Sequence, residues 1–318
     1  MSEFDFKSIW SGRVDQGEVP ELSLRLHQII KSVSEADKAG LAILGFCSDE
    51  GVRRNQGRVG AVQAPNQIRK FLASLPWNAK QPVYEAGNVA CQHSDLESAQ
   101  AELSVEVQNV LRQDHFPFVL GGGHEVAYGS WLGLSSYLRL SAQTPKIGII
   151  NFDAHFDLRT AANGCNSGTP FYQIAQACQE QDWPFRYCCL GVSEMANTQA
   201  LFQRAHDLGV SYRIDKQMTL LDLPEIKAQL QAFMADCDHL YLTVDLDVLP
   251  ASVAPGVSAP AARGVGLEVI EPLIELIRTS QKLRLADLAE YNPHYDQDSH
   301  TARVAARLFY SITGANHE

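Results

Sequence analysis

Three short segments concentrate the residue types that bind metal ions, and each follows an apolar run. Residues 119–125 read Val-Leu-Gly-Gly-Gly-His-Glu, residues 149–157 end in Asp-x-His-x-Asp, and residues 242–247 end in Asp-x-Asp. Alternate residues of an extended chain point to one face, so each spaced set directs its side chains into one space. The candidate ligands are His124, Asp153, His155, Asp157, Asp245 and Asp247.

These two imidazoles and four carboxylates predict a pair of divalent ions. A single catalytic zinc needs three protein ligands and an open position, so one metal would leave too many carboxylates unneutralised. Oxygen and imidazole ligation without a thiolate favours Mn²⁺ over zinc or copper. Two such ions lower the pKa of a shared water molecule and generate a nucleophile at neutral pH. We therefore expect a hydrolase that contains two Mn²⁺ ions per chain and acts on a small molecule.

Each segment taken alone has a simpler explanation. A glycine-rich turn often connects a strand to a helix or binds a phosphate, and aspartates commonly cap helices and turns. Three such endings in order, each directly after an apolar strand, are hard to produce by capping. The combination therefore favours a metal site.

The elements that must position these ligands alternate between apolar runs and amphipathic stretches. The expected strands are 41–46, 116–120, 146–152, 186–192, 239–244 and 283–288. The expected helices are 95–111, 125–138, 197–208, 223–235, 267–278 and 300–310. This alternation predicts a three-layer α/β/α fold with a central, mostly parallel sheet. Ligands bind beyond the carboxyl ends of such strands, where the three segments lie. We find no linker or repeat, so we expect a single catalytic domain over residues 1–318.

Composition narrows the partners and the compartment. A formal net charge of −11 argues against nucleic acid, because Lys and Arg supply most of the affinity for phosphates. No apolar run has the length of a membrane span, and the start lacks the basic and apolar regions of a secretory signal. The seven cysteines are scattered and odd in number, which matches no disulfide framework. We expect a reduced, cytoplasmic protein with a small-molecule substrate and without a nucleic-acid or membrane partner.

At these residues the sequence resembles the ureohydrolase family, which includes arginase, agmatinase and formimidoylglutamase. The resemblance extends from Gly45 to about Leu308. It implies an arginase-like α/β/α fold, a bridged Mn²⁺ pair and a homo-oligomer. One ion would be held by His124, Asp153, Asp157 and Asp245. The other would be held by Asp153, His155, Asp245 and Asp247.

The resemblance also implies a mechanism and two catalytic carboxylates. A metal-bridging hydroxide would attack an amidine or guanidine carbon, and the departing amine would need a proton. Asp157 is the candidate proton shuttle. Glu290, within Asp287–Pro293, matches the family glutamate that faces the amidine cation. The alternative for Glu290 is a structural glutamate at a strand end.

Two departures from the arginase pattern point to one branch of the family. Arginase and agmatinase have a His-Gly-x-Pro segment where this chain reads Ser-Gly-Thr-Pro at residues 167–170, and Leu249-Pro250 stands where arginases have Leu-Asp-Pro. Both changes, with residues 49–60, resemble formimidoylglutamase. That branch converts N-formimidoyl-L-glutamate and water to L-glutamate and formamide in histidine degradation.

A dianionic substrate requires local cations in an acidic protein, and guanidinium groups bind carboxylates bidentately. Arg159 lies two residues past Asp157, from where it can reach the pocket. For Arg53 and Arg54, a solvated surface position is an equal alternative, as an ordinary turn is for Asn166. The candidate substrate-binding residues are Arg53, Arg54, Arg58, Arg159, Asn166 and Ser167.

Three alternatives stay open. An agmatinase or another guanidino-acid ureohydrolase would use the same metals and release urea. A deacetylase of the related fold would hold one zinc ion. A metal-binding regulatory subunit would hold two ions without turnover.

Overall fold

A parallel sheet of nine strands runs through the computed structural model, which describes residues 5–140, 144–162 and 164–315. The strand order is β1-β3-β2-β4-β9-β8-β5-β6-β7, and every pairing is parallel. The strands are β1 (Lys31–Ser32), β2 (Leu41–Cys47), β3 (Val83–Ala90), β4 (Phe116–Leu120), β5 (Ile147–Phe152), β6 (Arg186–Val192), β7 (Ser211–Ile214), β8 (His239–Asp245) and β9 (Leu283–Ala289).

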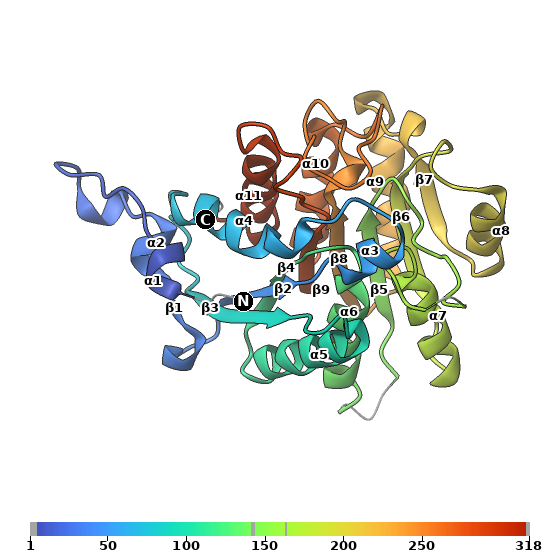
Figure 1. The fold of residues 1–318 in the computed structure, drawn as a ribbon, viewed down its shortest axis with the longest axis horizontal. Helices are drawn as coiled ribbons and strands as arrows, with labels where there is room; N and C mark the ends of the chain where they lie inside the picture. Colours follow the sequence, from blue (N-terminus) through green and yellow to red (C-terminus); the bar gives the residue numbers. More distant parts are fainter. Residues whose placement is uncertain (1–4, 141–143, 163, 316–318) are drawn as a thin grey trace.

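Helices cover both faces of this sheet, which confirms the predicted three-layer α/β/α fold (Figure 1). The longer helices are α4 (Ala64–Ala73), α5 (Leu96–Arg112), α6 (Val126–Leu138), α7 (Pro170–Glu180), α8 (Gln199–Asp207), α9 (Leu223–Ala235), α10 (Leu267–Thr279) and α11 (His300–Thr313). The shorter ones are α1 (Phe6–Ile9), α2 (Leu26–Ile29) and α3 (Glu50–Arg54). Within the described residues, no helix is both long and apolar enough to cross a membrane.

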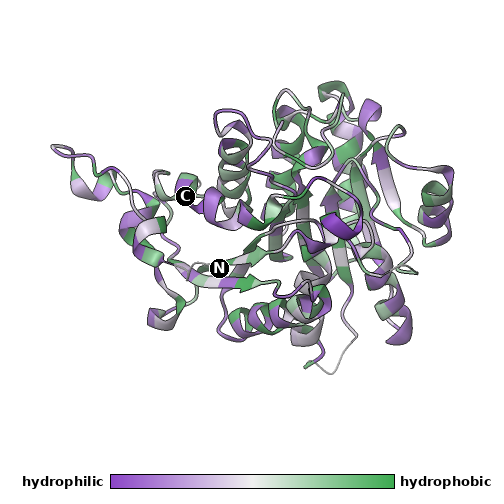
Figure 2. Cartoon of the chain, in the orientation of Figure 1, coloured by the Kyte–Doolittle hydropathy of each residue, from purple (hydrophilic) through white to green (hydrophobic). Residues whose placement is uncertain are grey.

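The two faces of the sheet have separate hydrophobic cores. Helices α4, α9, α10 and α11 pack on one face, where Ile68 and Leu273 are buried. Helices α5, α6, α7 and α8 pack on the other, where Leu103 and Trp131 are buried. Figure 2 shows the resulting pattern, with hydrophobic residues along the central strands and mixed residues on the outer helices. Strands buried on both faces explain why the apolar runs are continuous.

Six strands were predicted within one residue of each bound, whereas β1, β3 and β7 were missed. Strand β3 contains Glu85, Gly87 and Asn88, and its register against β2 shifts at this point. The polar residues interrupt the apolar pattern, and glycine in a strand commonly marks such an irregularity. Strand β7 is a four-residue edge strand without a fully buried residue. Helices α4 and α7, which begin at or beside a proline, were also missed.

The strand order brings the predicted chemistry to one edge of the sheet. Strands β4, β9, β8 and β5 are consecutive neighbours. The chain passes from β4 to β5 across the two positions that β9 and β8 later fill, so neighbouring loops diverge at their carboxyl ends. His124, Asp153 and Asp245 lie at three of these ends, and Glu290 follows the fourth.

Candidate metal centre

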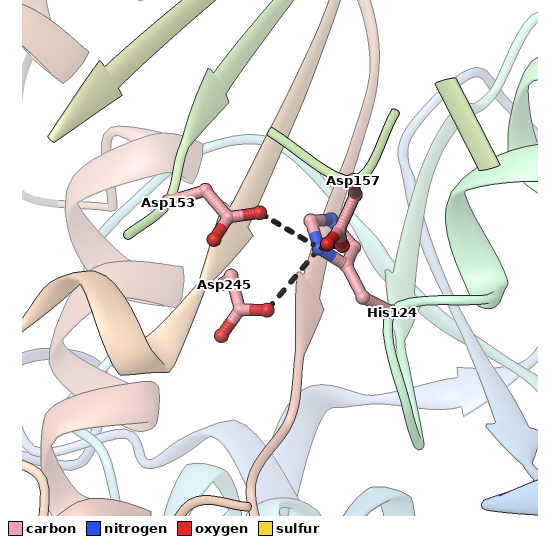
Figure 3. A group of neighbouring side chains, drawn as sticks. All are labelled: His124, Asp153, Asp157 and Asp245. Carbon is pink, nitrogen blue, oxygen red and sulfur yellow. Dashed lines mark ion pairs between the residues drawn. The ribbon is translucent and has the colours of Figure 1, made fainter. Parts of the chain in front are cut away.

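The imidazole of His124 lies at the centre of the first group of candidate ligands (Figure 3). Its Nδ1 atom is 3.0 Å from an oxygen of Asp157 and 3.1 Å from oxygens of both Asp153 and Asp245. The histidine comes from the loop after β4, and the carboxylates come from the ends of β5 and β8. Folding therefore gathers four residues from three strand ends around one point.

A second group contains Asp153, His155 and Asp247. The Nδ1 atom of His155 is 3.0 Å from Asp247 Oδ2 and 3.5 Å from Asp153 Oδ1. His155 is the most exposed candidate ligand, with 27% of its side chain accessible, whereas Asp153 is fully buried. Because Asp153 belongs to both groups, the structure places the two potential ion positions side by side.

The backbone of the ligand loops is fixed by the ligands themselves. The N–H of His155 donates to Asp153 Oδ1 at 2.6 Å, and the N–H of Asp247 donates to Asp245 Oδ1 at 2.8 Å. Asp157 and Glu290 both have positive φ angles, 49° and 67°. Such conformations are unfavourable for non-glycine residues and cluster at functional sites.

Burial and crowding shift the pKa values of these groups. Burial and then repulsion from Asp247 raise the pKa of Asp245 well above its ordinary value. Burial and the charge of Asp153 raise the pKa of Asp157 to about 6. Burial disfavours the charged form of His124, but the three aspartates within 3.0–3.1 Å of Nδ1 outweigh burial and raise the pKa of His124 well above its ordinary value. The carboxylates thus favour a cation at the position that they surround.

The residues present fit a metal ion at this point. The buried Nδ1 atom of His124 has no hydrogen bond of ordinary geometry with any described residue, whereas Nε2 lies 3.0 Å from Thr243 Oγ1. An imidazole that donates through Nε2 keeps a lone pair on Nδ1, here directed at three carboxylates. The four carboxylates of the two groups carry four negative charges when ionised, which two divalent ions neutralise. This donor set suits Mn²⁺.

A cavity of about 340 Å³ opens over the candidate ligands. Arg159 lines it, and its guanidinium makes no hydrogen bond or ion pair with the residues that the structure describes. The backbone N–H of Arg159 donates to the carbonyl of Gly168 at 2.8 Å, which fixes its position beside the 164–169 turn. Arg159 is therefore a cation available to a ligand in this cavity.

Glu290 also lines the cavity and is 5% exposed. Its Oε1 atom accepts a 2.9 Å hydrogen bond from the backbone N–H of His124, while Oε2 has no partner among the described residues. Burial and the neighbouring Glu125 raise the pKa of Glu290 to about 8. One oxygen thus holds the His124 loop and the other is available to a cationic ligand.

The other three predicted arginines have protein partners. Arg53 and Arg54 both donate to the carboxylate of Glu50, and Arg54 also donates to Glu97 and to the carbonyl of Cys165. Neither lines the cavity. Arg58 lines it but donates to the carbonyls of Val257 and Ser258, and its guanidinium stacks on Tyr295 at 3.9 Å. Their predicted contacts with substrate stay predictions.

Ser167 lines the cavity, is 7% exposed, and accepts a hydrogen bond of 3.2 Å from Asn55 Nδ2. Asn166 does not line it. Its side-chain oxygen accepts a 2.9 Å hydrogen bond from the backbone of Gly168, and its side-chain nitrogen faces the carbonyl of Gly164 at 3.4 Å. The structure thus gives Asn166 a role within the turn, and a substrate contact for it stays a prediction.

Sequence reasoning missed Asn197, which lines the cavity beside the ligand loop. It was expected to be the first residue of a helix, but α8 begins at Gln199 and the buried side chain of Asn197 binds the 154–156 backbone. Its contacts are 41 to 43 residues away in the chain. No local pattern near Asn197 indicates such contacts.

Comparisons with known proteins identify the family to which this sequence is similar. The sequence model of the arginase family matches residues 39–314. A formimidoylglutamase of Aeromonas hydrophila is 57% identical over 307 residues, with 96% of each chain covered. A formimidoylglutamase of Ralstonia nicotianae is 52% identical, with 95% of this chain and 93% of the relative covered.

Solved structures resemble the chain over nearly its whole length. The crystal structure of Trypanosoma cruzi formiminoglutamase with Mn²⁺₂ has a TM-score of 0.78 and 27% identity, and covers 93% of this chain and 99% of that one. The formimidoylglutamase of Bacillus subtilis has a TM-score of 0.82 at 22% identity, over 96% of this chain and 94% of that one. At that identity the second likeness concerns the fold.

Proposed function

The chain belongs to the arginase family, and from this premise we propose that it is a binuclear manganese hydrolase that converts N-formimidoyl-L-glutamate and water to L-glutamate and formamide. The observation that carries the proposal is the pair of ligand groups sharing Asp153, in a chain that matches formimidoylglutamases over about 96% of its length. Two Mn²⁺ ions bound there supply an activated water molecule as the nucleophile at neutral pH.

The cavity residues have separate parts in this reaction. Glu290 directs a buried oxygen without a described partner at the cationic formimidoyl group, which orients its carbon for attack. Arg159 binds a carboxylate of the glutamate moiety, since it is the candidate substrate-binding arginine whose guanidinium has no protein partner among the described residues. Ser167, on the adjacent turn, is proposed to donate a hydrogen bond to the same moiety.

Bond cleavage requires proton movement, for which Asp157 is proposed as the carrier. Asp157 lines the cavity, and one of its carboxylate oxygens lies 3.0 Å from His124 Nδ1 in the first ligand group. Its carboxylate accepts the proton that the attacking water loses, and then delivers it to the departing nitrogen. The carbon–nitrogen bond to glutamate breaks while the carbonyl of formamide forms.

We also propose that residues 1–318 form one catalytic domain in the cytoplasm, with a small-molecule substrate and without nucleic-acid or membrane partners. The single nine-stranded sheet of the described residues supports the first part. All seven cysteines are free, which supports a reducing compartment. A homo-oligomer is proposed on the resemblance to the family, and sedimentation of the Mn²⁺-loaded protein tests it.

A substrate panel tests the proposed reaction. With Mn²⁺, we expect turnover of N-formimidoyl-L-glutamate with equal amounts of formamide and L-glutamate, and no urea from arginine, agmatine or guanidinobutyrate. A higher kcat/KM for any guanidino compound would replace the proposal with another ureohydrolase activity. Full activity with one zinc ion per chain would exclude the binuclear manganese site.

A further inference from the structure

A series of buried polar side chains leads from His124 into the sheet. The Nε2 atom of His124 is 3.0 Å from Thr243 Oγ1. Thr243 lies opposite Asp287 in the register of β8 and β9, and the buried Oδ1 atom of Asp287 has no hydrogen-bond partner among the described residues. The hydroxyl of Tyr241 donates to Asp287 Oδ2 at 2.5 Å. All of these side chains are 1% exposed or less.

The spacing along β8 explains why this network lies behind the metal centre. Tyr241, Thr243 and Asp245 are alternate residues of one strand, so their side chains share a face of the sheet. Asp287 is outside the cavity lining and has no assigned part in the reaction. Burying a carboxylate costs free energy unless the carboxylate is hydrogen-bonded. The burial of Asp287 behind the metal centre therefore calls for a structural explanation.

The direction of the hydrogen bonds determines which nitrogen of His124 carries a hydrogen. An ionised carboxylate only accepts hydrogen bonds. Asp287 Oδ2 accepts the hydroxyl hydrogen of Tyr241, and the unpartnered Oδ1 is the acceptor available to the hydroxyl of Thr243, the residue opposite Asp287. The oxygen of Thr243 then acts as the acceptor toward His124 Nε2. With its hydrogen on Nε2, the imidazole presents the lone pair of Nδ1 to the cluster of Asp153, Asp157 and Asp245.

We propose that Asp287 and Thr243 are positioning residues that hold His124 in its metal-binding tautomer, with Tyr241 fixing the orientation of Asp287. This inference rests on the manganese site of the proposed function. Outer partners of ligating histidines fix the ring and its tautomer, and their replacement typically lowers metal affinity about 10- to 100-fold.

Three substitutions test the direction of the hydrogen bonds. Thr243→Val keeps the shape of the side chain and removes the acceptor for Nε2–H. Thr243→Ser restores the hydroxyl. Asp287→Asn keeps the shape but introduces N–H donors, which reverse the direction of the hydrogen bond to Thr243 and favour hydrogen on Nδ1. The matched control is Tyr84→Phe, because Tyr84 is a buried β3 tyrosine whose hydroxyl donates to the Lys38 carbonyl.

The readouts are the number and affinity of Mn²⁺ ions bound, and the electron paramagnetic resonance signal of a coupled ion pair. Wild type, Thr243→Ser and Tyr84→Phe are expected to bind two ions with affinities within about 3-fold of one another. Thr243→Val and Asp287→Asn should keep the ion beside His155, bind the ion beside His124 about 10- to 100-fold more weakly, and lose the coupled signal.

Unchanged affinity in both Thr243→Val and Asp287→Asn would overturn the inference. An equal loss in Thr243→Ser would do so as well, because a hydroxyl at this position would then be irrelevant. Circular dichroism and thermal unfolding of the metal-free proteins establish whether each variant is folded. If Thr243→Val does not fold, the Mn²⁺ affinity of Asp287→Asn alone tests the inference. Failure of the wild type to bind Mn²⁺ would overturn the proposed function itself, and this inference with it.

Discussion

The side-chain oxygen of Asn197 accepts a 3.0 Å hydrogen bond from the backbone N–H of Phe156, and its nitrogen donates to the carbonyl of Ala154 at 2.9 Å. These two backbone groups flank His155 on either side. The residues from Asp153 to Thr169 contain no helix or strand among those described, so one buried amide holds a segment that lacks a regular ladder.

We expect Asn197→Ala to weaken Mn²⁺ binding about 10-fold or more at the His155 position, because the loop that carries this ligand loses both anchors. The free energy of unfolding of the metal-free protein should fall by about 1–3 kcal/mol, since two buried backbone groups lose their partners. Metal titration and denaturant unfolding measure these quantities. Asn78→Ala, at an exposed position, is the control and should change neither. Equal Mn²⁺ affinity in Asn197→Ala and wild type would remove Asn197 from the site.

Metal removal should lower thermal stability, since the candidate ligands are carboxylates held close together. Mn²⁺ at about 100 times its dissociation constant should stabilise the folded chain by about 2.7 kcal/mol per site. We expect Asp245→Asn to abolish turnover and most of this stabilisation, because Asp245 is the ligand contributed by the end of β8 to the His124 group. Differential scanning calorimetry with and without chelator provides the measurement. A normal Mn²⁺ response in Asp245→Asn would exclude this residue as a ligand.

The candidate ligands could be predicted because their signal is local. Asp153 and Asp245 each end a continuous apolar run, and period-two spacing puts the following ligand on the same side of the chain. The general tendency of parallel sheets to bind ligands at their carboxyl edge then brings separate segments together. The all-parallel order of nine strands, by contrast, depends on β1, β3 and β7, whose short or polar sequences carry little strand signal.

The substrate-side residues were harder to predict because their partners are distant in the sequence. Arg53, Arg54 and Arg159 look alike as sequence, yet Glu50 binds the first two and leaves the third free among the described residues. Sequence shows which residues are charged, but not which charges are already paired. The role of Asn197 could not be predicted for the same reason, because its hydrogen-bond partners lie over 40 residues away in the chain.

Glu50 predicts a pH-dependent contribution to stability. Hydrogen bonds from Arg53 and Arg54 outweigh burial and lower the pKa of Glu50 to about 2. An unfolded glutamate titrates near pH ~4.3, so the carboxylate stabilises the fold above that pH and loses its contribution as the pH falls toward 2. The loss of unfolding free energy in Glu50→Gln should therefore be about 1 kcal/mol at pH 6, since Arg53 is exposed, and should shrink at pH 3.5. A difference that stays constant between these pH values would contradict this assignment.

Arg159 and Arg53 form a matched pair for testing how the substrate is recognised. Arg159 lines the cavity without a described partner, whereas Arg53 is 60% exposed and paired with Glu50. Replacing Arg159 with alanine removes a charge-assisted anchor for a substrate carboxylate. We expect this change to cost about 2–4 kcal/mol of transition-state binding, which is roughly 30- to 1,000-fold in kcat/KM. Arg53→Ala should change kcat/KM by less than about 3-fold.

The decisive measurement compares two substrates in wild type and Arg159→Ala at equal metal content. N-formimidoyl-L-glutamate has the carboxylates that Arg159 would bind, whereas N-methylformamidine has none and should react slowly and equally with both proteins. Arg159→Lys should recover only part of the loss, because an ammonium lacks the planar fork of a guanidinium. An unchanged ratio of the two specificity constants would show that Arg159 does not bind the glutamate moiety. Arg58 would then be the next arginine to replace, because it also lines the cavity.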